Sequence, residues 1–255
     1  MNLIKSCMIA LSMYSKIPVP QFEWKEENMR YSLLFFPVVG LVIGVLEIVW
    51  FFLGKRFGFP VGFEAAFAVV IPVFVTGGIH LDGYCDTVDA LSSFQSRERR
   101  LEILKDSHSG AFAIIWTGVY FLLNDGIWYL LGDGKLVLMA GLCYVSSRAW
   151  SGLAIMFFPA AKKNGLLVTF ANAADRCIVR VGLSLIVLLT SAVQIYLFPV
   201  AGAILAVCQV ILFFYYKQMS GKKFGGITGD LAGWFLQCCE LLSLYVCGLC
   251  GCLFG

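Results

Sequence analysis

Long apolar stretches alternate with short polar segments along this chain. The apolar stretches lie at 31–54, 61–79, 110–132, 135–158, 178–198, 200–216 and 231–253. Each approaches the roughly 20 residues that a helix needs to cross a bilayer. The pattern predicts an all-α fold, a polytopic transmembrane helical bundle of about seven spans in a single domain over residues 1–255. Asn124 and Asp125 interrupt the third stretch and Pro199 blurs the boundaries beside it, so six or eight spans stay open.

The composition indicates a membrane protein, because 60% of the residues are hydrophobic and only 14% are charged. A soluble domain carries about 25% charged residues. Of the 19 Lys and Arg residues, 15 fall on one alternating set of loops and three on the other, with Arg148 inside a span. By the positive-inside rule this bias predicts a cytoplasmic N-terminus. The net charge of +3 is spread over the loops, so we expect contact with membrane lipid and no nucleic-acid partner.

A shorter apolar stretch, Cys7–Tyr14, precedes the first span. It leads into Lys16-Ile17-Pro18-Val19-Pro20 rather than a small-residue cleavage site, so no secretory signal is expected. Proline cannot continue a helix interior, because it lacks the amide hydrogen. We therefore predict a short N-terminal interfacial helix that the prolines terminate.

Three aspartates follow the second apolar stretch, in Gly77-Gly78-Ile79-His80-Leu81-Asp82-Gly83-Tyr84-Cys85-Asp86-Thr87-Val88-Asp89. On a helix that advances about 100° per residue, Asp82, Asp86 and Asp89 share an arc of about 60°. Carboxylates this close repel one another unless a hard cation lies between them, so the spacing predicts a Mg²⁺ site with these three ligands. A solvated helix end is the ordinary alternative. His80 falls on the opposite side of the helix, where it would act as a cap or supporting partner.

A second glycine-rich segment, Lys217–Asp230, lies at the same predicted face of the membrane. Glycines let backbone amides converge on an anion, and lysines add positive charge. The segment predicts phosphate binding, although an ordinary membrane-flanking turn has the same composition. Asp230 would complete the metal site. The candidate phosphate-binding residues are Lys222, Lys223, Gly225, Gly226 and Thr228.

Basic residues also occur between the second and third spans. Arg97 and Arg100 could clamp phosphates bidentately, and Lys105 lies in the same loop. Glu98 and Glu102 could equally pair with these cations in a surface network. Both interpretations stay open.

Ionisable residues also lie within the apolar stretches, where such groups usually face a bundle interior or a water-filled cavity. Arg148 is expected to form a buried structural pair with Glu47 or Glu240.

Several motifs together resemble one known family. They are His80-Leu81-Asp82-Gly83 with Asp86-Thr87 and Asp89, Leu101-Glu102-Ile103-Leu104-Lys105-Asp106-Ser107, Gly110-Ala111-Phe112, Ile17-Pro18-Val19-Pro20 and Gly225-Gly226-Ile227-Thr228-Gly229-Asp230. The combination resembles the cobalamin synthase family, the adenosylcobinamide-GDP ribazoletransferases. That family often has small or aliphatic residues where Tyr84 and Cys85 stand and Arg where His108 stands, which weakens any role for these three positions.

The resemblance implies transfer of the cobinamide phosphate of adenosylcobinamide-GDP onto the 3′-hydroxyl of α-ribazole or α-ribazole 5′-phosphate, with release of GMP. Mg²⁺ held by the aspartates would neutralise the diphosphate. Asp89 or His80 would take the hydroxyl proton, and Asp230 would act as ligand or alternative base. The implied location is the cytoplasmic (inner) membrane of a bacterium or archaeon, with an open cytoplasmic cavity. The preferred base, the form of the acceptor and the number of protomers in a homo-oligomer stay open.

Two other classes fit less well. A CDP-alcohol phosphotransferase would need Ala-Arg after Asp82-Gly83, and a polyprenyl-diphosphate aromatic prenyltransferase would repeat its acidic motif in the second half, where only Asp230 stands. A cation-coupled transporter would use the buried charges as a relay, but the chain has no evident inverted repeat.

Overall fold

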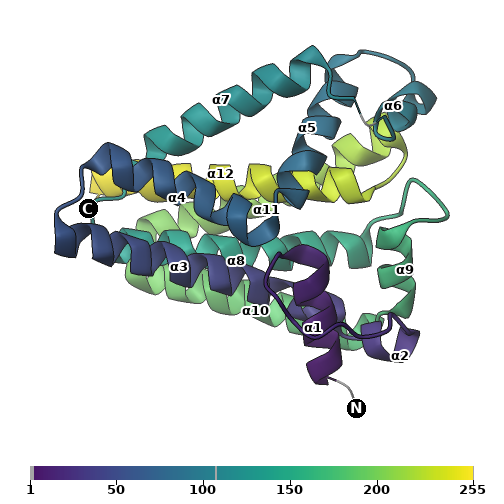
Figure 1. Ribbon diagram of the computed structural model, residues 1–255, viewed down its shortest axis with the longest axis horizontal. Coiled ribbons are helices and arrows are strands. Elements are labelled where there is room, and N and C mark those ends of the chain that lie inside the picture. The colour runs from purple at the N-terminus through teal and green to yellow at the C-terminus, as the bar shows by residue number, and fades with distance from the viewer. Residues whose placement is uncertain (1–2, 107, 255) are drawn as a thin grey trace.

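The computed structural model describes residues 3–106 and 108–254, so Ser107 of the motifs above lies outside it. The regular structure within this range is helical (Figure 1). The helices are α1 (Leu3–Tyr14), α2 (Glu26–Met29), the 3₁₀ helix η1 (Ser32–Phe35), α3 (Phe36–Phe57), α4 (Val61–Thr76), α5 (Ile79–Ser92), α6 (Arg97–Ile103), α7 (Ala111–Trp128), α8 (Gly134–Phe157), α9 (Leu166–Ala173), α10 (Arg176–Leu197), α11 (Pro199–Phe224) and α12 (Gly229–Phe254).

The predicted transmembrane bundle is confirmed. Each of the seven apolar stretches contains one long helix: α3, α4, α7, α8, α10, α11 and α12. Within the described residues, six helices are long and apolar enough to cross a membrane, and the bent pair α4 and α5 brings the number to seven. No further helix in residues 3–106 and 108–254 is long and apolar enough to form an eighth span. Figure 1 shows the long helices side by side, with α1, α5, α6 and α9 gathered at the end of the bundle away from the C-terminus.

The second predicted span ends earlier than expected and turns sharply. Helix α4 stops at Thr76, and the chain bends by 98° into α5. The bend uses Gly77 and Gly78, whose φ angles of 64° and 80° lie in the left-handed region that only glycine adopts freely. At 16 residues, α4 is about 24 Å long. Helix α5 therefore leaves the direction of the span and lies at its end.

The N-terminal segment holds this bend in place. Helix α1 ends at Tyr14, before the two prolines, as the sequence predicted. The next residues pass beside the bend, where the Lys16 amide donates to the Val75 carbonyl over 2.8 Å. The Lys16 side chain covers Gly77, since a Cβ there would lie 2.3 Å from Lys16 Cε. The N-terminus is thus part of the framework that orients α5.

Helix α11 is longer than the sequence suggested, so the predicted boundary at residue 216 is wrong. The helix continues through Lys222 and Lys223 to Phe224 and ends at Gly225, whose φ angle is 78°. Basic side chains in a last turn interact favourably with the helix dipole, so these polar residues extend the helix instead of starting a loop. The connection to α12 shrinks to Gly225–Thr228.

A buried ion pair links α8 and α12. Arg148 is fully buried and pairs with Glu240, and its Nη1 also donates to the Tyr144 carbonyl over 2.9 Å. The predicted pair is therefore confirmed with Glu240 as partner. Glu47, the alternative, is also buried, and its side-chain oxygens have no hydrogen-bond partner among the described residues.

Candidate active site

The three aspartates of the sequence motif, called the acidic stripe below, lie on one helix, as predicted. Helix α5 contains Asp82, Asp86 and Asp89, and Asp82 lies in its first turn. Asp82 is exposed, while Asp86 and Asp89 are half-buried. Among the described residues none of the three forms an ion pair. This face of α5 therefore carries negative charge without a protein cation to balance it.

A fourth carboxylate reaches the stripe through a very close helix crossing. Helix α5 passes over the start of α12 at Gly83, where a Cβ would lie 2.7 Å from the Asp230 carbonyl oxygen. On the other side of the crossing, a Cβ on Gly233 would lie 2.9 Å from the His80 carbonyl oxygen. Only residues without side chains let two backbones approach this closely. The crossing brings Asp230 beside the α5 aspartates, which is the position it would need to complete the expected metal site.

The electrostatics of the cluster follow from this crowding. Burial and the neighbouring charges of Asp82, Asp230 and Asp89 raise the pKa of Asp86 to about 6. A carboxyl that holds its proton more tightly because of other carboxylates marks a site where a bound cation would relieve repulsion. Asp86 is therefore the carboxyl group that the other three carboxylates all influence.

The residues fit Mg²⁺ only as an incomplete ligand set. Within the described part of the chain, no group of three or more His, Cys, Asp or Glu side chains is arranged to hold one metal ion. The Asp89 carboxylate lies against Gly110, since a Cβ there would be 2.2 Å from both its oxygens. Mg²⁺ commonly binds one or two carboxylates and takes its other ligands from water and substrate phosphates. Asp82 and Asp86, with Asp230 beside them, satisfy that requirement.

Asp89 occupies a position that the helical arc alone did not reveal. Gly110 is the residue that precedes α7, so Asp89 lies at the N-terminus of that helix. Negative charge is stabilised there by the helix dipole. This contact gives Asp89 a local partner that Asp82 and Asp86 lack.

The predicted basic residues are spread over different environments. Arg97 donates from Nε to the Phe224 carbonyl over 2.9 Å, and its guanidinium lies over Gly225. Arg100 is buried, and its Nε has no hydrogen-bond partner among the described residues. Arg97 therefore joins α6 to the end of α11. The remaining predicted cations, Lys105, Lys222 and Lys223, are exposed.

The late glycine segment binds another loop. The Ile227 amide donates to the Pro159 carbonyl over 2.9 Å, and the Ala161 amide donates to the Ile227 carbonyl over 2.9 Å. A Cβ on Gly226 would collide with this loop, at 2.5 Å from the Pro159 oxygen. Thr228 accepts a hydrogen bond from the Leu231 amide over 3.2 Å and so caps the start of α12. The segment thus fixes the position of Asp230.

Lys162 is a residue that the sequence reasoning missed. It lies in the loop that Ile227 binds, and it lines a pocket of about 230 Å³ together with Asn164, Thr228 and Asp230. In the sequence, Lys162 is only one of the 15 basic residues on one set of loops. Two backbone hydrogen bonds described above hold the Lys162 loop beside the α11–α12 connection. No sequence pattern predicts these bonds.

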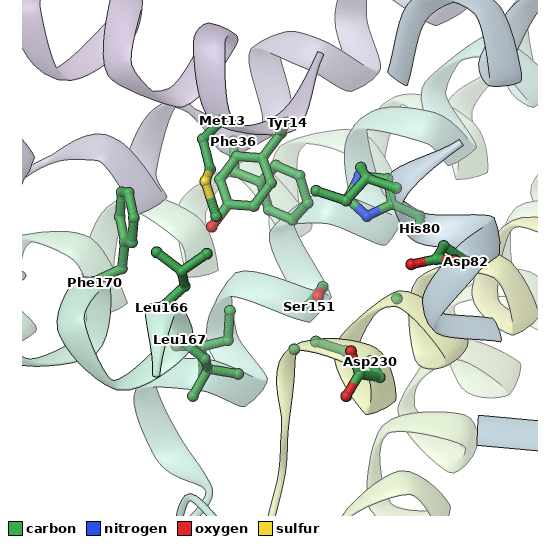
Figure 2. A pocket seen from close by; sticks show the side chains of 15 residues that line it. Met13, Tyr14, Phe36, His80, Asp82, Ser151, Leu166, Leu167, Phe170 and Asp230 are labelled. Carbon is green, nitrogen blue, oxygen red and sulfur yellow. The ribbon is translucent and has the colours of Figure 1, made fainter. Parts of the chain in front are cut away.

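An aromatic pocket opens beside the carboxylates. Its volume is about 190 Å³, and Asp82 and Asp230 line it. Figure 2 shows these two carboxylates on one side and the rings of Tyr14, Phe36 and Phe170 on the other. His80 also lines the pocket, with its ring centroid 5.5 Å from that of Phe36. The buried His80 Nε2 has no hydrogen-bond partner among the residues that the structure describes.

These features define a class of protein: a polytopic membrane bundle with a carboxylate-lined pocket at one end. The chain belongs to the Cobalamin-5-phosphate synthase (CobS) family, whose profile matches residues 6–248. This confirms the family resemblance noted from the motifs.

Curated relatives cover nearly the whole chain. A protein of Lachnoclostridium phytofermentans named adenosylcobinamide-GDP ribazoletransferase is 46% identical over 243 residues, which is 95% of this chain and 93% of that protein. Proteins with the same name from Desulfitobacterium hafniense (33% identical, 94% of this chain and 95% of that one) and Clostridium botulinum strain Alaska E43 (30%, 96% and 97%) are also similar. No solved structure matches this chain.

Proposed function

We propose that this protein is an adenosylcobinamide-GDP ribazoletransferase. It would transfer the cobinamide phosphate from its GDP ester to α-ribazole or α-ribazole 5′-phosphate, release GMP and form adenosylcobalamin or its 5′-phosphate. The observation that carries this proposal is the meeting of Asp82, Asp86 and Asp230 beside a pocket, in a chain of the CobS family. The names of the relatives supply the reaction.

The unbalanced carboxylates suit a reaction on a diphosphate. Mg²⁺ held by Asp82 and Asp86, with Asp230 as a further ligand, would supply charge neutralisation of the diphosphate. Without such a counter-charge these side chains would repel the donor. Burial and the neighbouring carboxylates raise the pKa of Asp86, and the second of these causes supports the assignment, because crowded carboxylates also favour a divalent cation.

Lys162 is the basic residue best placed to meet a phosphate. It shares a pocket with Asp230 and Thr228. A lysine there would act as a point charge on the diphosphate and orient it toward the acceptor. Arg97, Arg100, Lys105, Lys222 and Lys223, together with Gly225, Gly226 and Thr228, stay as predicted contributors around this pocket.

The acceptor hydroxyl must lose a proton as the new phosphorus–oxygen bond forms. The 3′-oxygen bonds to the cobinamide phosphorus, the bond from that phosphorus to the bridging oxygen breaks, and GMP leaves with the electron pair. Asp230 lines the pocket and is the group we assign to receive the hydroxyl proton when it is not a metal ligand. Asp89 and His80 stay as alternatives, although Asp89 contacts Gly110 and His80 is buried between rings.

The site would face the cytoplasm. Helices α5, α6 and α9 lie at one end of the bundle (Figure 1), and the loops at that end carry most of the Lys and Arg residues. The positive-inside rule assigns such an end to the cytoplasmic side of a bacterial or archaeal inner membrane. The large polar donor would then reach the pocket without crossing the bilayer.

One reaction mixture tests the proposal. Purified protein in nanodiscs receives adenosylcobinamide-GDP, α-ribazole and Mg²⁺, and mass spectrometry follows cobalamin and GMP, with EDTA as control. We expect both products in equal amounts, with Mg²⁺ only. No product from folded protein would contradict the proposed function.

A further inference from the structure

The aromatic pocket has the size and lining of a binding site for one planar ring. Its three Tyr and Phe rings come from elements other than the aspartate-bearing helices: Tyr14 from α1, Phe36 from α3 and Phe170 from α9. The ring centroid of Tyr14 lies 4.1 Å from that of Phe36 and 6.4 Å from that of Phe170. Offset aromatic rings at these separations attract one another and any further ring placed among them.

We propose that this pocket binds the planar heteroaromatic base of the acceptor ribonucleoside and so sets the choice of base. The proposal rests on the proposed function, since it assigns a substrate to the same site. A base held among Tyr14, Phe36 and Phe170 would place its attached ribose toward Asp82 and Asp230, which lie on the opposite side of the pocket (Figure 2). The hydroxyl that reacts would then meet the carboxylates.

The volume of the aromatic pocket is small compared with the corrin and nucleotide parts of the donor. An apolar cavity of about 150 Å³ takes one benzene-sized ring. The pocket of about 190 Å³ therefore holds one small ring system. A corrin macrocycle and a whole nucleoside diphosphate are both larger than this volume, so we place the donor outside the aromatic pocket, with its diphosphate toward Lys162.

The lining favours an apolar base over guanine, the other planar ring in the reaction. The pocket wall also includes the apolar side chains of Met13, Ile155, Leu166 and Leu167, and among the described residues Ser151 is its one hydroxyl-bearing side chain apart from Tyr14. The polar edge of guanine would lose its hydrogen bonds to water there, at a cost of about 1–3 kcal/mol for each unpaired group. A base with an apolar edge and a single free ring nitrogen loses little, because it has only one hydrogen-bonding group to take out of water.

Two substitutions on α9 test the assignment. Leu167→Trp adds bulk to a half-buried wall of the pocket, and Phe170→Leu removes one ring. The matched controls are Thr169→Trp, exposed on the same helix, and Phe213→Leu, a buried ring outside the pocket. The acceptors are the α-ribosides of dimethylbenzimidazole, benzimidazole and adenine.

Steady-state kinetics then separate acceptor binding from the chemical step. We expect Leu167→Trp to raise the acceptor KM for dimethylbenzimidazole riboside about 10-fold or more, and less for the smaller benzimidazole. Phe170→Leu should raise the acceptor KM about 3- to 10-fold for every base, because one stacking contact is lost. For Phe170→Leu, whose ring lines the aromatic pocket and not the Lys162 pocket, the donor KM and kcat should stay within about twofold, and both controls should match the wild type.

Unchanged acceptor KM values in both pocket variants, with an active wild type, would overturn the base site and leave the proposed function standing. Absence of product from the wild type would instead contradict the proposed function. In that case equilibrium binding of radiolabelled dimethylbenzimidazole riboside to the full-length protein in nanodiscs still decides the question. Binding that Leu167→Trp weakens and Thr169→Trp does not would support the site, and equal binding in all three proteins would refute it.

Discussion

Two groups of charged residues in this molecule differ in whether the protein itself balances their charge. In the bundle interior, the fully buried Arg148 is paired with Glu240 and is further bonded to the Tyr144 carbonyl. At the end of the bundle, Asp82 and Asp86 lie beside Asp230 with no ion-pair partner among the described residues. The first group is balanced within the protein, and the second is not.

The difference indicates where a ligand belongs. A charge inside a membrane is costly, so a structural charge there needs a partner within the protein. Water at the end of the bundle lowers that cost, and carboxylates can then remain unpaired until a cation and a substrate arrive. Charged residues thus stabilise the fold in one region and, in the proposed function, bind a cation and a substrate in the other.

The largest expected effect comes from neutralising the unpaired group. Asp82→Asn and Asp86→Asn should each lower kcat/KM by about 1,000-fold or more, because the amide binds a cation poorly and leaves the diphosphate charge unbalanced. Turnover in nanodiscs measures this, and size-exclusion chromatography should show folded protein. Asp125→Asn on α7, away from the pocket, is the matched control. Near-normal activity in both site variants would remove the metal assignment.

Breaking the paired group should instead affect stability. Arg148→Met leaves Glu240 as an isolated buried charge, and we expect a loss of about 3–5 kcal/mol in the free energy of unfolding. Adding Glu240→Leu should recover most of that loss, since an apolar pair replaces the ions. Thermal unfolding in detergent reports both changes.

An exposed ion pair supplies the control for that experiment. Arg30 binds Asp175 over 2.6 Å, with the Arg30 side chain 55% exposed. Arg30→Met should cost much less stability than Arg148→Met, because solvent screens an exposed pair. If the Arg148 and Arg30 variants lost the same stability, burial would not explain the role of the interior pair.

The close crossing of α5 and α12 should give an intermediate effect. A Cβ from Gly83→Ala would press on Asp230 at 2.7 Å from its carbonyl oxygen, so the helices must separate. We expect activity to fall about 10- to 100-fold, since displacement of catalytic groups by about 1 Å has effects of this size. Gly118→Ala, where a new Cβ has no neighbour within 4 Å, should keep full activity.

Lowering the pH should have a smaller effect on stability, through the buried and crowded carboxyl group of Asp86. Its pKa is raised from 3.8 to about 6 in the folded protein, so its unfavourable contribution grows as the pH rises through that range. Metal-free protein should therefore gain stability from this group as the pH falls from 7 to 5, by a few degrees in Tm. Asp86→Asn should abolish that gain. An identical pH dependence of Tm in both proteins would contradict the raised pKa of Asp86.

The sequence was sufficient for the parts of the fold and site that depend on local pattern. The apolar stretches predicted the long helices, and the spacing of Asp82, Asp86 and Asp89 predicted one helical face, because both follow from residues near in sequence. The same reasoning misplaced the end of α11, since a basic last turn and a loop have similar composition. The left-handed Gly225 decides that boundary, and only the backbone shows it.

The rest of the site depends on contacts between distant segments. The crossing at Gly83 and Gly233 brings Asp230 to α5, and two backbone hydrogen bonds bring the Lys162 loop to the same place. The rings of Tyr14 and Phe170 come from short helices that lie outside the predicted spans. Such contacts arise from packing, which a single sequence does not encode as a pattern.

The most direct test of the central claim is cation binding by the unpaired carboxylates. Electron paramagnetic resonance would measure Mn²⁺, as a probe for Mg²⁺, bound to the nanodisc protein with adenosylcobinamide-GDP present. The wild type and Asp125→Asn should show a saturable site, and the double variant Asp82→Asn, Asp86→Asn should lose it. Equal Mn²⁺ binding by all three proteins would contradict the account.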